Sequence, residues 1–405
     1  MGAAMLNTFL LAGLLMCGCG GSGTSSGSSA TPAAASPTIT TTPAQNGAMI
    51  VTLKSSTSGA TIYYTDDNSA PTTSAQVYEA PFLVAANLTV KAIASAPGSS
   101  VSSVTTQAFA PNIAAGTLVW SDEFNSTGSK SQPNPLIWTY DTGNSSFGNH
   151  ELENYCAWGS NAAPCSTASP SAYVGADGYL HIVAQQPSPG VYTSARMKTQ
   201  GLFSFQYGRF EVRAQIPEAQ GFWPAAWLLG NNITTVDWPA SGEQDVLERV
   251  NAAKSPDWNE GSIHGIGFTG DIGLGTIYNF PGGQTAAGWH TYGMIWTRGG
   301  VAYYVDDPGH PYVTYSTSNL NALSGAVWPF DAGQSNSFCL TWRLAATGPG
   351  RRIRARHFHR KCWWIMCGSI QTELGSNTAA RKGAVIPFPL SEKPCLVYAC
   401  LCLSR

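Results

Sequence analysis

The chain has 405 residues, of which 43% are hydrophobic and only 11% charged, and its formal net charge is −2. This charge gives no reason to expect nucleic acid as a partner. The length exceeds that of one ordinary domain, so we expect a main domain with at least one accessory region. The 43 glycines, 16 tyrosines and 13 tryptophans favour short strands and turns, which predicts an all-β protein.

The chain begins with an apolar stretch from Met5 to Met16 that is followed by small residues. This stretch is too short to cross a bilayer, so residues 1–19 are predicted to be an export signal. Gly18 directly precedes Cys19, as in a bacterial lipoprotein cleavage site. The predicted location is therefore secreted or outer cell surface, with Cys19 as the candidate for a lipid anchor.

Two segments with different compositions follow the predicted signal. Residues 20–36 are rich in Gly and Ser and are predicted to be a flexible linker. Residues 37–111 contain short β-branched and aromatic runs separated by turn residues, which predicts a small β-sandwich. This segment resembles the immunoglobulin-like domain at the C-terminal end of chitobiases. A spacer is the favoured role, and a sugar platform formed by Tyr63 and Tyr64 is the alternative.

Residues 116–338 continue the all-β pattern, and their size predicts two large packed sheets in a jelly-roll sandwich. Within them, WPASGEQDVLERV contains three closely spaced acids, Glu243, Asp245 and Glu248. On a regular strand Glu243 and Asp245 share one face, while Glu248 points to the other. One extra residue in a β-bulge between Asp245 and Glu248 would bring all three onto the same face.

Three carboxyl groups on one face suit the hydrolysis of a glycosidic bond with retention. That reaction needs two carboxyls about 5–5.5 Å apart, one as nucleophile and one as acid/base. Glu243 and Glu248 would fill these roles, with the shorter Asp245 beneath them, and crowding should raise at least one pKa. The alternatives are a solvated acidic strand edge or a metal site. The flanking segments WPA and GFWPAAWLLG favour stacking on sugars.

At these residues the chain resembles glycoside hydrolase family 16, in its laminarinase-like branch, which implies a concanavalin-like β-jelly-roll. The acid motif has two residues before its last Glu, as is typical of members that cut β-1,3-glucans. Gln244 departs from the usual aliphatic residue, but we expect it to face away from the cleft. The resemblance rests on seven segments in order: LVWSDEFN, GNHELENY, YGRFEVRAQIP, GFWPAAWLLG, GEQDVLE, SIHG and WHTYGMIWT.

The resemblance implies a role for each matching residue. Glu243 would be the nucleophile, Glu248 the acid/base and Asp245 the helper. Core packing is the alternative for each of the three implied tryptophans. The residues implied to stack on glucose rings or to make polar contacts with the sugar are Trp223, Trp227, Trp238, Asn149, Glu151, Arg196 and His264.

The ten cysteines do not form one disulfide framework. Two lie in the predicted signal and six after residue 338. Cys156 and Cys165 remain, and in an oxidising compartment they could close one loop. No Cys/His spacing suggests zinc. A structural calcium ion sometimes accompanies the family, near the opening and closing strands, but this sequence does not support one.

Residues 339–405 depart from the family pattern. They hold 11 of the 21 Lys and Arg residues, so residues 1–338 have 10 basic and 21 acidic residues. Two closing segments, resembling NLAVGGNWPG and MLVDYVRVY, are missing. If each codon is read one base earlier, any codons for Cys362–Ile370 must encode Leu-Val-Asp at the second to fourth positions, as in MLVDYVRVY. In the same displaced frame, the codons for Cys339–Gly350 can encode LSNLATGGDWPG, which resembles NLAVGGNWPG. We therefore predict a frameshifted, non-native tail that lacks both closing strands.

The favoured function is a monomeric endo-β-1,3-glucanase that acts on laminarin-like polysaccharide by double displacement without a cofactor. The first alternative is another specificity of the family, such as mixed-linkage glucan, agar, carrageenan or transglycosylation. The second is a non-catalytic β-glucan-binding protein, against which the intact Glu243 and Glu248 argue. The third is an inactive product of a damaged gene.

Overall fold

The computed structural model describes residues 31–126, 128–217, 221–249, 258–331, 336–344 and 369–371. The predicted signal, most of the linker and most of the predicted tail lie outside these residues. The described chain is almost entirely β, as predicted. It has one short α-helix, α1 (Ile233–Val236), and four 3-10 helices, η1 (Gln45–Gly47), η2 (Ser146–Gly148), η3 (Gly270–Ile272) and η4 (Thr317–Ala322). No helix among the described residues is long and apolar enough to span a membrane.

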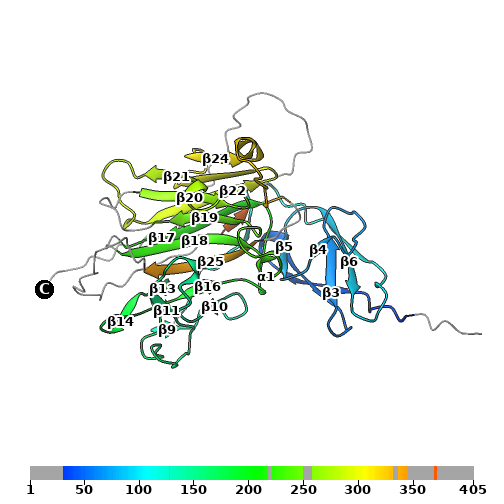
Figure 1. Cartoon of the computed structure of the whole chain (residues 1–405), viewed down its shortest axis with the longest axis horizontal. Helices are drawn as coiled ribbons and strands as arrows, with labels where there is room; N and C mark the ends of the chain where they lie inside the picture. The colour runs from blue at the N-terminus through cyan, green and yellow to red at the C-terminus, as the bar shows by residue number, and fades with distance from the viewer. Residues whose placement is uncertain are drawn as a thin grey trace, which may run out of the picture.

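The N-terminal region forms a small β-sandwich, here called the Ig-like domain, which lies beside the larger domain in Figure 1. One sheet contains β1 (Thr38–Pro43), β2 (Met49–Lys54) and β5 (Phe82–Val84). The other contains β4 (Gln76–Val77), β3 (Thr61–Thr65), β6 (Leu88–Ser95) and β7 (Thr105–Phe109). Tyr64 is 3% exposed and stacks on Phe82 with ring centroids 4.8 Å apart. The alternative of a sugar platform is therefore wrong for Tyr64, because strand alternation turns this ring into the core.

Two large sheets build the larger domain (Figure 1). The first, here called the cleft sheet, runs in the order β10 (Thr139–Asp141), β16 (Arg196–Lys198), β25 (Asn336–Leu344), β18 (Phe222–Gly230), β19 (Glu243–Glu248), β20 (Trp258–His264) and β21 (Leu274–Asn279). The second runs in the order β24 (Val313–Ser316), β23 (Gly300–Val305), β22 (His290–Thr297), β17 (Gly208–Ala214), β26 (Ser369–Gln371) and β8 (Leu118–Trp120).

Two small sheets complete the larger domain. One contains β11 (Glu153–Tyr155), β15 (Val191–Ser194) and β14 (Gln185–Ser188), and the other β13 (Leu180–Ile182), β12 (Ala172–Gly175) and β9 (Lys130–Ser131).

The main core lies between the two large sheets. Leu228, Val246 and Ile263 of the cleft sheet join Phe210 and Met294 of the second sheet in one cluster, each at most 1% exposed. β17 alternates strictly between buried and partly exposed residues, as a strand with one face on a core must. The jelly-roll prediction is confirmed.

The prediction that both closing strands are absent is wrong for the folded chain. β25 lies between β16 and β18 and pairs with β18 along its whole length, and β26 lies between β17 and β8. A strand pairs with its neighbours through backbone N–H and C=O groups, which every residue except proline supplies in full. The described chain therefore has a strand at each of these two positions.

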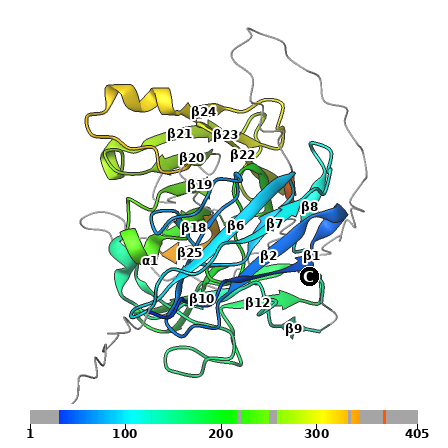
Figure 2. The ribbon, with the colours of Figure 1, turned by 90° about the vertical axis from the view of Figure 1, so that its right-hand side faces the viewer.

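The Ig-like domain, which lies in front of the larger domain in Figure 2, makes specific contacts with it. Ala48 is 1% exposed and belongs to the main core cluster of the larger domain. Gln45 donates a hydrogen bond of 2.7 Å to the Ser121 hydroxyl. The backbone amide of Leu83 donates to the carbonyl of Ser204 at 2.9 Å. A shared buried residue and these bonds tie the two domains together.

Candidate active site

The three predicted acids lie on β19, next to the middle of the cleft sheet. Asp245 is opposite Ser262 and Glu248 opposite Glu260, so the strand contains one residue more than its partner between these two pairs. The same irregularity appears against β18, where Ala226 faces Leu247 but Trp227 faces Asp245. The predicted β-bulge is confirmed, and it turns Glu248 to the face that carries Glu243 and Asp245.

Each glutamate accepts a hydrogen bond from a tryptophan. The indole N–H of Trp238 donates to Glu243 Oε2 at 2.6 Å, and that of Trp223 donates to Glu248 Oε1 at 2.8 Å. Trp238 is 47% exposed, so its ring also presents a free face beside Glu243. Both tryptophans therefore hold carboxylates, a role beyond the sugar stacking that the resemblance implied.

Asp245 is buried beneath the two glutamates, with 2% of its surface exposed. The hydroxyl of Ser262 donates to Asp245 Oδ2 at 2.8 Å, and His264 Nε2 lies 3.2 Å from the same oxygen. Tyr303 donates to the backbone carbonyl of Ser262 at 2.7 Å. Two residues of the neighbouring strand β20 therefore hold Asp245, and Tyr303 on β23 of the opposite sheet holds Ser262.

His264 carries a positive charge in this acidic surrounding. Burial alone lowers the pKa of its imidazole, but the hydrogen bond to Asp245 and the negative charges of Asp245, Glu243 and Glu248 outweigh that effect. Together they raise the pKa of His264 to about 9. At neutral pH the imidazolium therefore offsets part of the crowded negative charge.

A second cluster lies at the far side of the cleft sheet, around Arg196. Its guanidinium lies 4.7 Å from the centroid of the Trp227 ring, and its Nε donates to Asp141 Oδ2 at 3.0 Å. Its Nη1 lies 3.9 Å from Glu151 Oε1, to which the Asn149 amide donates at 3.3 Å. The structure thus brings Asn149, Glu151 and Arg196 together, as an implied set of polar sugar contacts requires.

Trp227 is covered by its neighbours and is only 2% exposed. Its ring packs against the Arg196 guanidinium. The predicted direct contact of Trp227 with glucose stays a prediction, and the burial of the ring argues against it. Gln244 is fully buried, which fits the expectation that it faces away from the cleft.

A pocket of about 270 Å³ adjoins the Arg196 cluster. Its lining residues include Asp141, Phe147, Arg196, Lys198, Gln200 and Thr234. Sequence reasoning did not single out Asp141 or Lys198, which form an ion pair there. Asp141 lies on β10 and Lys198 on the adjacent β16, at the edge of the cleft sheet. Only the pairing of these two strands brings the side chains together.

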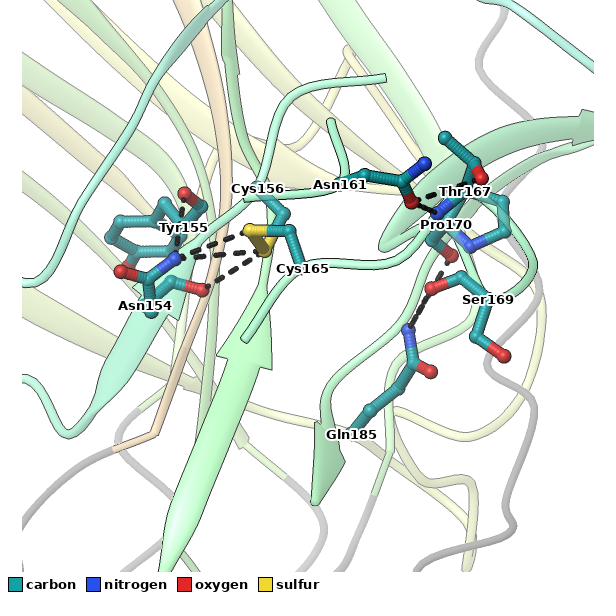
Figure 3. Close-up of a disulfide and its surroundings, with 9 residues drawn as sticks. All are labelled: Asn154, Tyr155, Cys156, Asn161, Cys165, Thr167, Ser169, Pro170 and Gln185. Atoms are coloured by element: carbon teal, nitrogen blue, oxygen red, sulfur yellow. Dashed lines mark hydrogen bonds between the residues drawn. A yellow bond between two sulfur atoms is a disulfide. The ribbon is translucent and has the colours of Figure 1, made fainter. Parts of the chain in front are cut away.

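A disulfide between Cys156 and Cys165 closes a loop that begins directly after Tyr155 (Figure 3). These are the two cysteines that the sequence left available for one loop. Tyr155, next to Cys156, donates from its hydroxyl to Glu151 Oε2 at 2.7 Å. The disulfide therefore constrains the segment that positions Glu151.

Sequence reasoning missed a fourth carboxyl, that of Glu260. It lies opposite Glu248 in the β19–β20 pair. Burial raises the pKa of Glu260, the charge of Asp245 raises it further, and His264 lowers it. The sequence did contain a signal for this carboxyl. Glu260, Ser262 and His264 are spaced two residues apart, so on a strand their side chains lie on the same face.

No cluster of three or more His, Cys, Asp or Glu residues that could hold a metal ion occurs among the described residues.

Comparisons with known proteins agree with this geometry. A model described as Glycosyl hydrolases family 16 matches residues 160–334, and one described as Fn3 associated matches residues 51–109. A beta-glucanase from Rhodothermus marinus is 34% identical over 221 residues, which cover 53% of this chain and 71% of that protein. A beta-1,3-glucan-binding protein from Penaeus monodon is 38% identical over 165 residues, which cover 38% of this chain and 42% of that protein.

A solved structure gives the same result. The catalytic domain of an endo-1,3-beta-glucanase (laminarinase) from Thermotoga petrophila RKU-1 is 30% identical and superposes with a TM-score of 0.52. The match covers 63% of this chain and 98% of that domain. With its jelly roll, its bulged acid strand and these relatives, the chain belongs to glycosyl hydrolase family 16.

Proposed function

We propose that the protein is a retaining endo-β-glucanase that hydrolyses β-1,3-glucan. The observation that carries the proposal is the bulged strand β19, which turns Glu243, Asp245 and Glu248 to one face. The indole bonds to Glu243 and Glu248 hold the carboxyls that the two chemical steps need.

In the first step Glu248 donates its proton to the glycosidic oxygen, while Glu243 attacks the anomeric carbon and forms a covalent glycosyl-enzyme. In the second step Glu248 takes a proton from water, which attacks the anomeric carbon and releases Glu243. Asp245, held by Ser262 and His264, orients the nucleophile from below. This sequence inverts the anomeric carbon twice and therefore retains its configuration.

The β-1,3 preference rests on the bulged acid motif and on the relatives. The Thermotoga domain is described as a laminarinase, and the Rhodothermus protein as a beta-glucanase. Mixed-linkage glucan is the second candidate substrate within the same mechanism. The Penaeus relative is described as a glucan-binding protein, so binding without catalysis is the competing function, and the intact carboxyl pair favours catalysis.

We also propose that the protein is exported, and that the coding sequence contains a one-base displacement between Asp331 and Cys339. The apolar N-terminal stretch supports export, with Cys19 as the candidate lipid anchor. The displacement is supported by the hidden family segments and by the concentration of 11 Lys and Arg residues after residue 338. In the displaced frame the backbone positions of β25 and β26 would receive the side chains of the family's closing segments.

The test is reducing-sugar release from laminarin, mixed-linkage glucan and agarose. It compares the full chain, the full chain with its tail rebuilt in the displaced frame, and Glu243→Gln in the rebuilt chain. We expect laminarin hydrolysis by the rebuilt chain, its loss in the variant, and weak activity or poor solubility of the original chain. A folded rebuilt chain that binds laminarin without cutting it would establish the binding function instead. Full activity of the original chain would refute the displacement.

A further inference from the structure

A short part of the Ig-like domain, residues 79–83 and here called the docking segment, contacts the larger domain at two places. The larger domain is from here on called the catalytic domain, because it carries the three acids. At the first place, Glu79 Oε1 accepts a hydrogen bond of 3.3 Å from the Thr235 hydroxyl on α1, which lies at the boundary between the domains in Figure 1. At the second place, the Pro81 carbonyl accepts bonds from the Ser204 backbone amide at 2.9 Å and from the Ser204 hydroxyl at 3.1 Å.

The core of the Ig-like domain holds the docking segment in place. Phe82 is 5% exposed and stacks on Tyr64. It begins β5, which pairs with β2. The backbone amide of Leu83, the next residue, donates to the Ser204 carbonyl at 2.9 Å. The two contacts are therefore fixed relative to each other by a buried part of the Ig-like domain.

Both contacts lie next to residues that line the pocket of about 270 Å³ beside Arg196. On α1, Ile233 and Thr234 line the pocket, and Thr235 directly follows them. On the other side of the contact, Lys198 and Gln200 line the pocket, and Ser204 follows the turn after them. The backbone amides of residues 202 and 203 both donate to the carbonyl of residue 199 at 2.9 Å, so this turn is compact. The docking segment therefore supports two of the chain segments that line the pocket.

The charges around the pocket are balanced. Arg196 and Lys198 both form ion pairs with Asp141, and Arg196 also lies near Glu151. Two cations thus face two carboxylates, which favours a neutral ligand over a sulfated one. Together with the amide of Gln200, these groups both donate and accept hydrogen bonds, as the hydroxyls of a sugar require.

The pocket lies on the same face of the cleft sheet as the acids. Leu229, which lines it, packs with Trp227 in a small cluster separate from the main core, and Trp227 is the cross-strand partner of Asp245. β25 and β18 lie between β16 and β19, so roughly 14 Å of sheet separates the pocket strand from the acid strand at about 4.8 Å per strand. A glucan chain must extend over this distance to reach both.

We propose that the Ig-like domain is part of the substrate site, because its docking segment positions the pocket, and that the pocket binds a neutral sugar unit remote from the bond that is cut. This inference rests on the proposed function, which supplies β-glucan as the substrate. Thr235 and Ser204 are positioning residues, since neither lines the pocket. Docking therefore increases the affinity for chains that span the acids and the pocket, and it does not change the affinity for shorter ones.

The experiment measures the binding of a short and a long laminarin oligosaccharide by isothermal titration calorimetry. The lengths are chosen so that only the long one spans roughly 14 Å. The protein is the full chain with the rebuilt tail, or the original chain if that is the active form, and it carries Glu243→Gln so that the ligands are not cut. Thr235→Val removes the hydroxyl that binds Glu79. We expect it to weaken binding of the long ligand roughly 2–10-fold and to leave binding of the short one unchanged.

Matched controls separate the docking contact from a general loss of stability. Thr40→Val also removes an exposed threonine hydroxyl with a bond of 3.3 Å, but that bond lies within the Ig-like domain, so both affinities should stay unchanged. Glu79→Gln keeps an acceptor for Thr235 and should behave as the wild type, whereas Glu79→Ala should match Thr235→Val. The Tm of each variant shows that it is folded.

A double-mutant cycle tests whether docking acts through the pocket. Gln200→Ala removes a polar group of the pocket. Effects of distant residues without shared partners usually add. If docking positions the pocket, the effect of Thr235→Val on the long ligand should instead become smaller in the Gln200→Ala background.

Each result decides the inference. Unchanged binding of the long ligand in Thr235→Val would overturn it, as would an equal loss for both ligands or strict additivity with Gln200→Ala. Tighter binding of a sulfated oligosaccharide than of the neutral one would overturn the assignment of the ligand. If the folded chain binds laminarin without cutting it, the proposed hydrolase function fails, while the binding data still decide whether the Ig-like domain belongs to the site.

Discussion

The side-chain amide of Asn46 in the Ig-like domain donates a hydrogen bond of 2.7 Å to the backbone carbonyl of Leu118 in the catalytic domain. Leu118 begins β8, which is the last strand of its sheet. A strand at a sheet edge presents unpaired backbone groups. The Ig-like domain therefore covers an edge that would otherwise be open to another chain.

Asn46→Asp should destabilise both domains together. Asn46 has a positive φ of 52°, which Asp also tolerates, so the change mainly replaces the donor by an acceptor that faces a carbonyl. The loss of about 1–2 kcal/mol should lower the Tm by roughly 2–8 °C, measured by differential scanning calorimetry as one transition. Asn68→Asp, at a similar φ of 67°, is the control. Two separate transitions, with only the smaller one shifted, would show that the domains unfold independently.

His264 should make stability depend on pH. Its folded pKa of about 9 lies above the usual value of 6.5. The stabilisation is therefore fully present below pH 6.5 and is lost as the pH rises through about 9. Thermal unfolding of the wild type and His264→Gln at intervals from pH 5.5 to pH 9.5 should show Tm values that converge as the pH rises. A constant difference in Tm across this range would contradict the charged imidazole.

The two indole hydrogen bonds should differ in their effect on catalysis. Trp223→Phe removes the donor to Glu248, and Trp238→Phe removes the donor to Glu243. Glu243 is ionised before the first step, and a hydrogen bond to a charged group contributes about 1.5–3 kcal/mol, which corresponds to roughly 10–100-fold in kcat/KM. Glu248 is protonated at that stage, and a hydrogen bond to an uncharged group contributes about 0.5–1.5 kcal/mol, or roughly 2–10-fold. We therefore expect the larger fall in Trp238→Phe, near the lower end of its range because Trp238 is 47% exposed and water screens its bond, and the smaller fall in Trp223→Phe. Steady-state kinetics on laminarin oligosaccharides give both values, and the reverse order would refute this argument.

Removal of the Cys156–Cys165 disulfide should weaken substrate binding more than it slows the chemistry. The pair of changes Cys156→Ser and Cys165→Ser frees the loop beside Tyr155, whose hydroxyl holds Glu151. A disulfide that closes a short loop contributes about 2–3 kcal/mol to stability. We expect a lower Tm and a higher KM on laminarin, with kcat nearly unchanged. An equal fall in kcat would show that the loop reaches the reacting carboxyls.

The acid strand was predictable because its signal is local. With this spacing, the side chains of Glu243, Asp245 and Glu248 can lie on one face of a strand only if the strand bulges. The pairing of β19 with β20 confirms the bulge. The burial of Trp227 was not predictable in the same way, since its covering partner Arg196 comes from a strand that is not its neighbour in sequence. Glu260 was missed for a similar reason, because its opposition to Glu248 depends on the pairing of two strands across the bulge.

The tail shows where side-chain patterns mislead. The absence of two family segments from it predicted that both closing strands would be missing. Strand pairing, however, uses backbone groups, and β25 and β26 occupy their positions in the two sheets. The docking of the Ig-like domain was also beyond the sequence, because Gln45 and Asn46 have no periodic pattern and their partners lie more than 70 positions away.

The place of β25 has a consequence for how the chain is made. β16 and β18 are not adjacent in the cleft sheet, and only residues 336–344 join them. During synthesis, β18, β19 and β20 therefore leave the ribosome well before β25, the strand that connects them to β16. Such long-range closure is slow and leaves strand edges open to association. A stop codon shortly before residue 336 would remove an interior strand, so the truncated product should aggregate during synthesis instead of folding as a smaller enzyme.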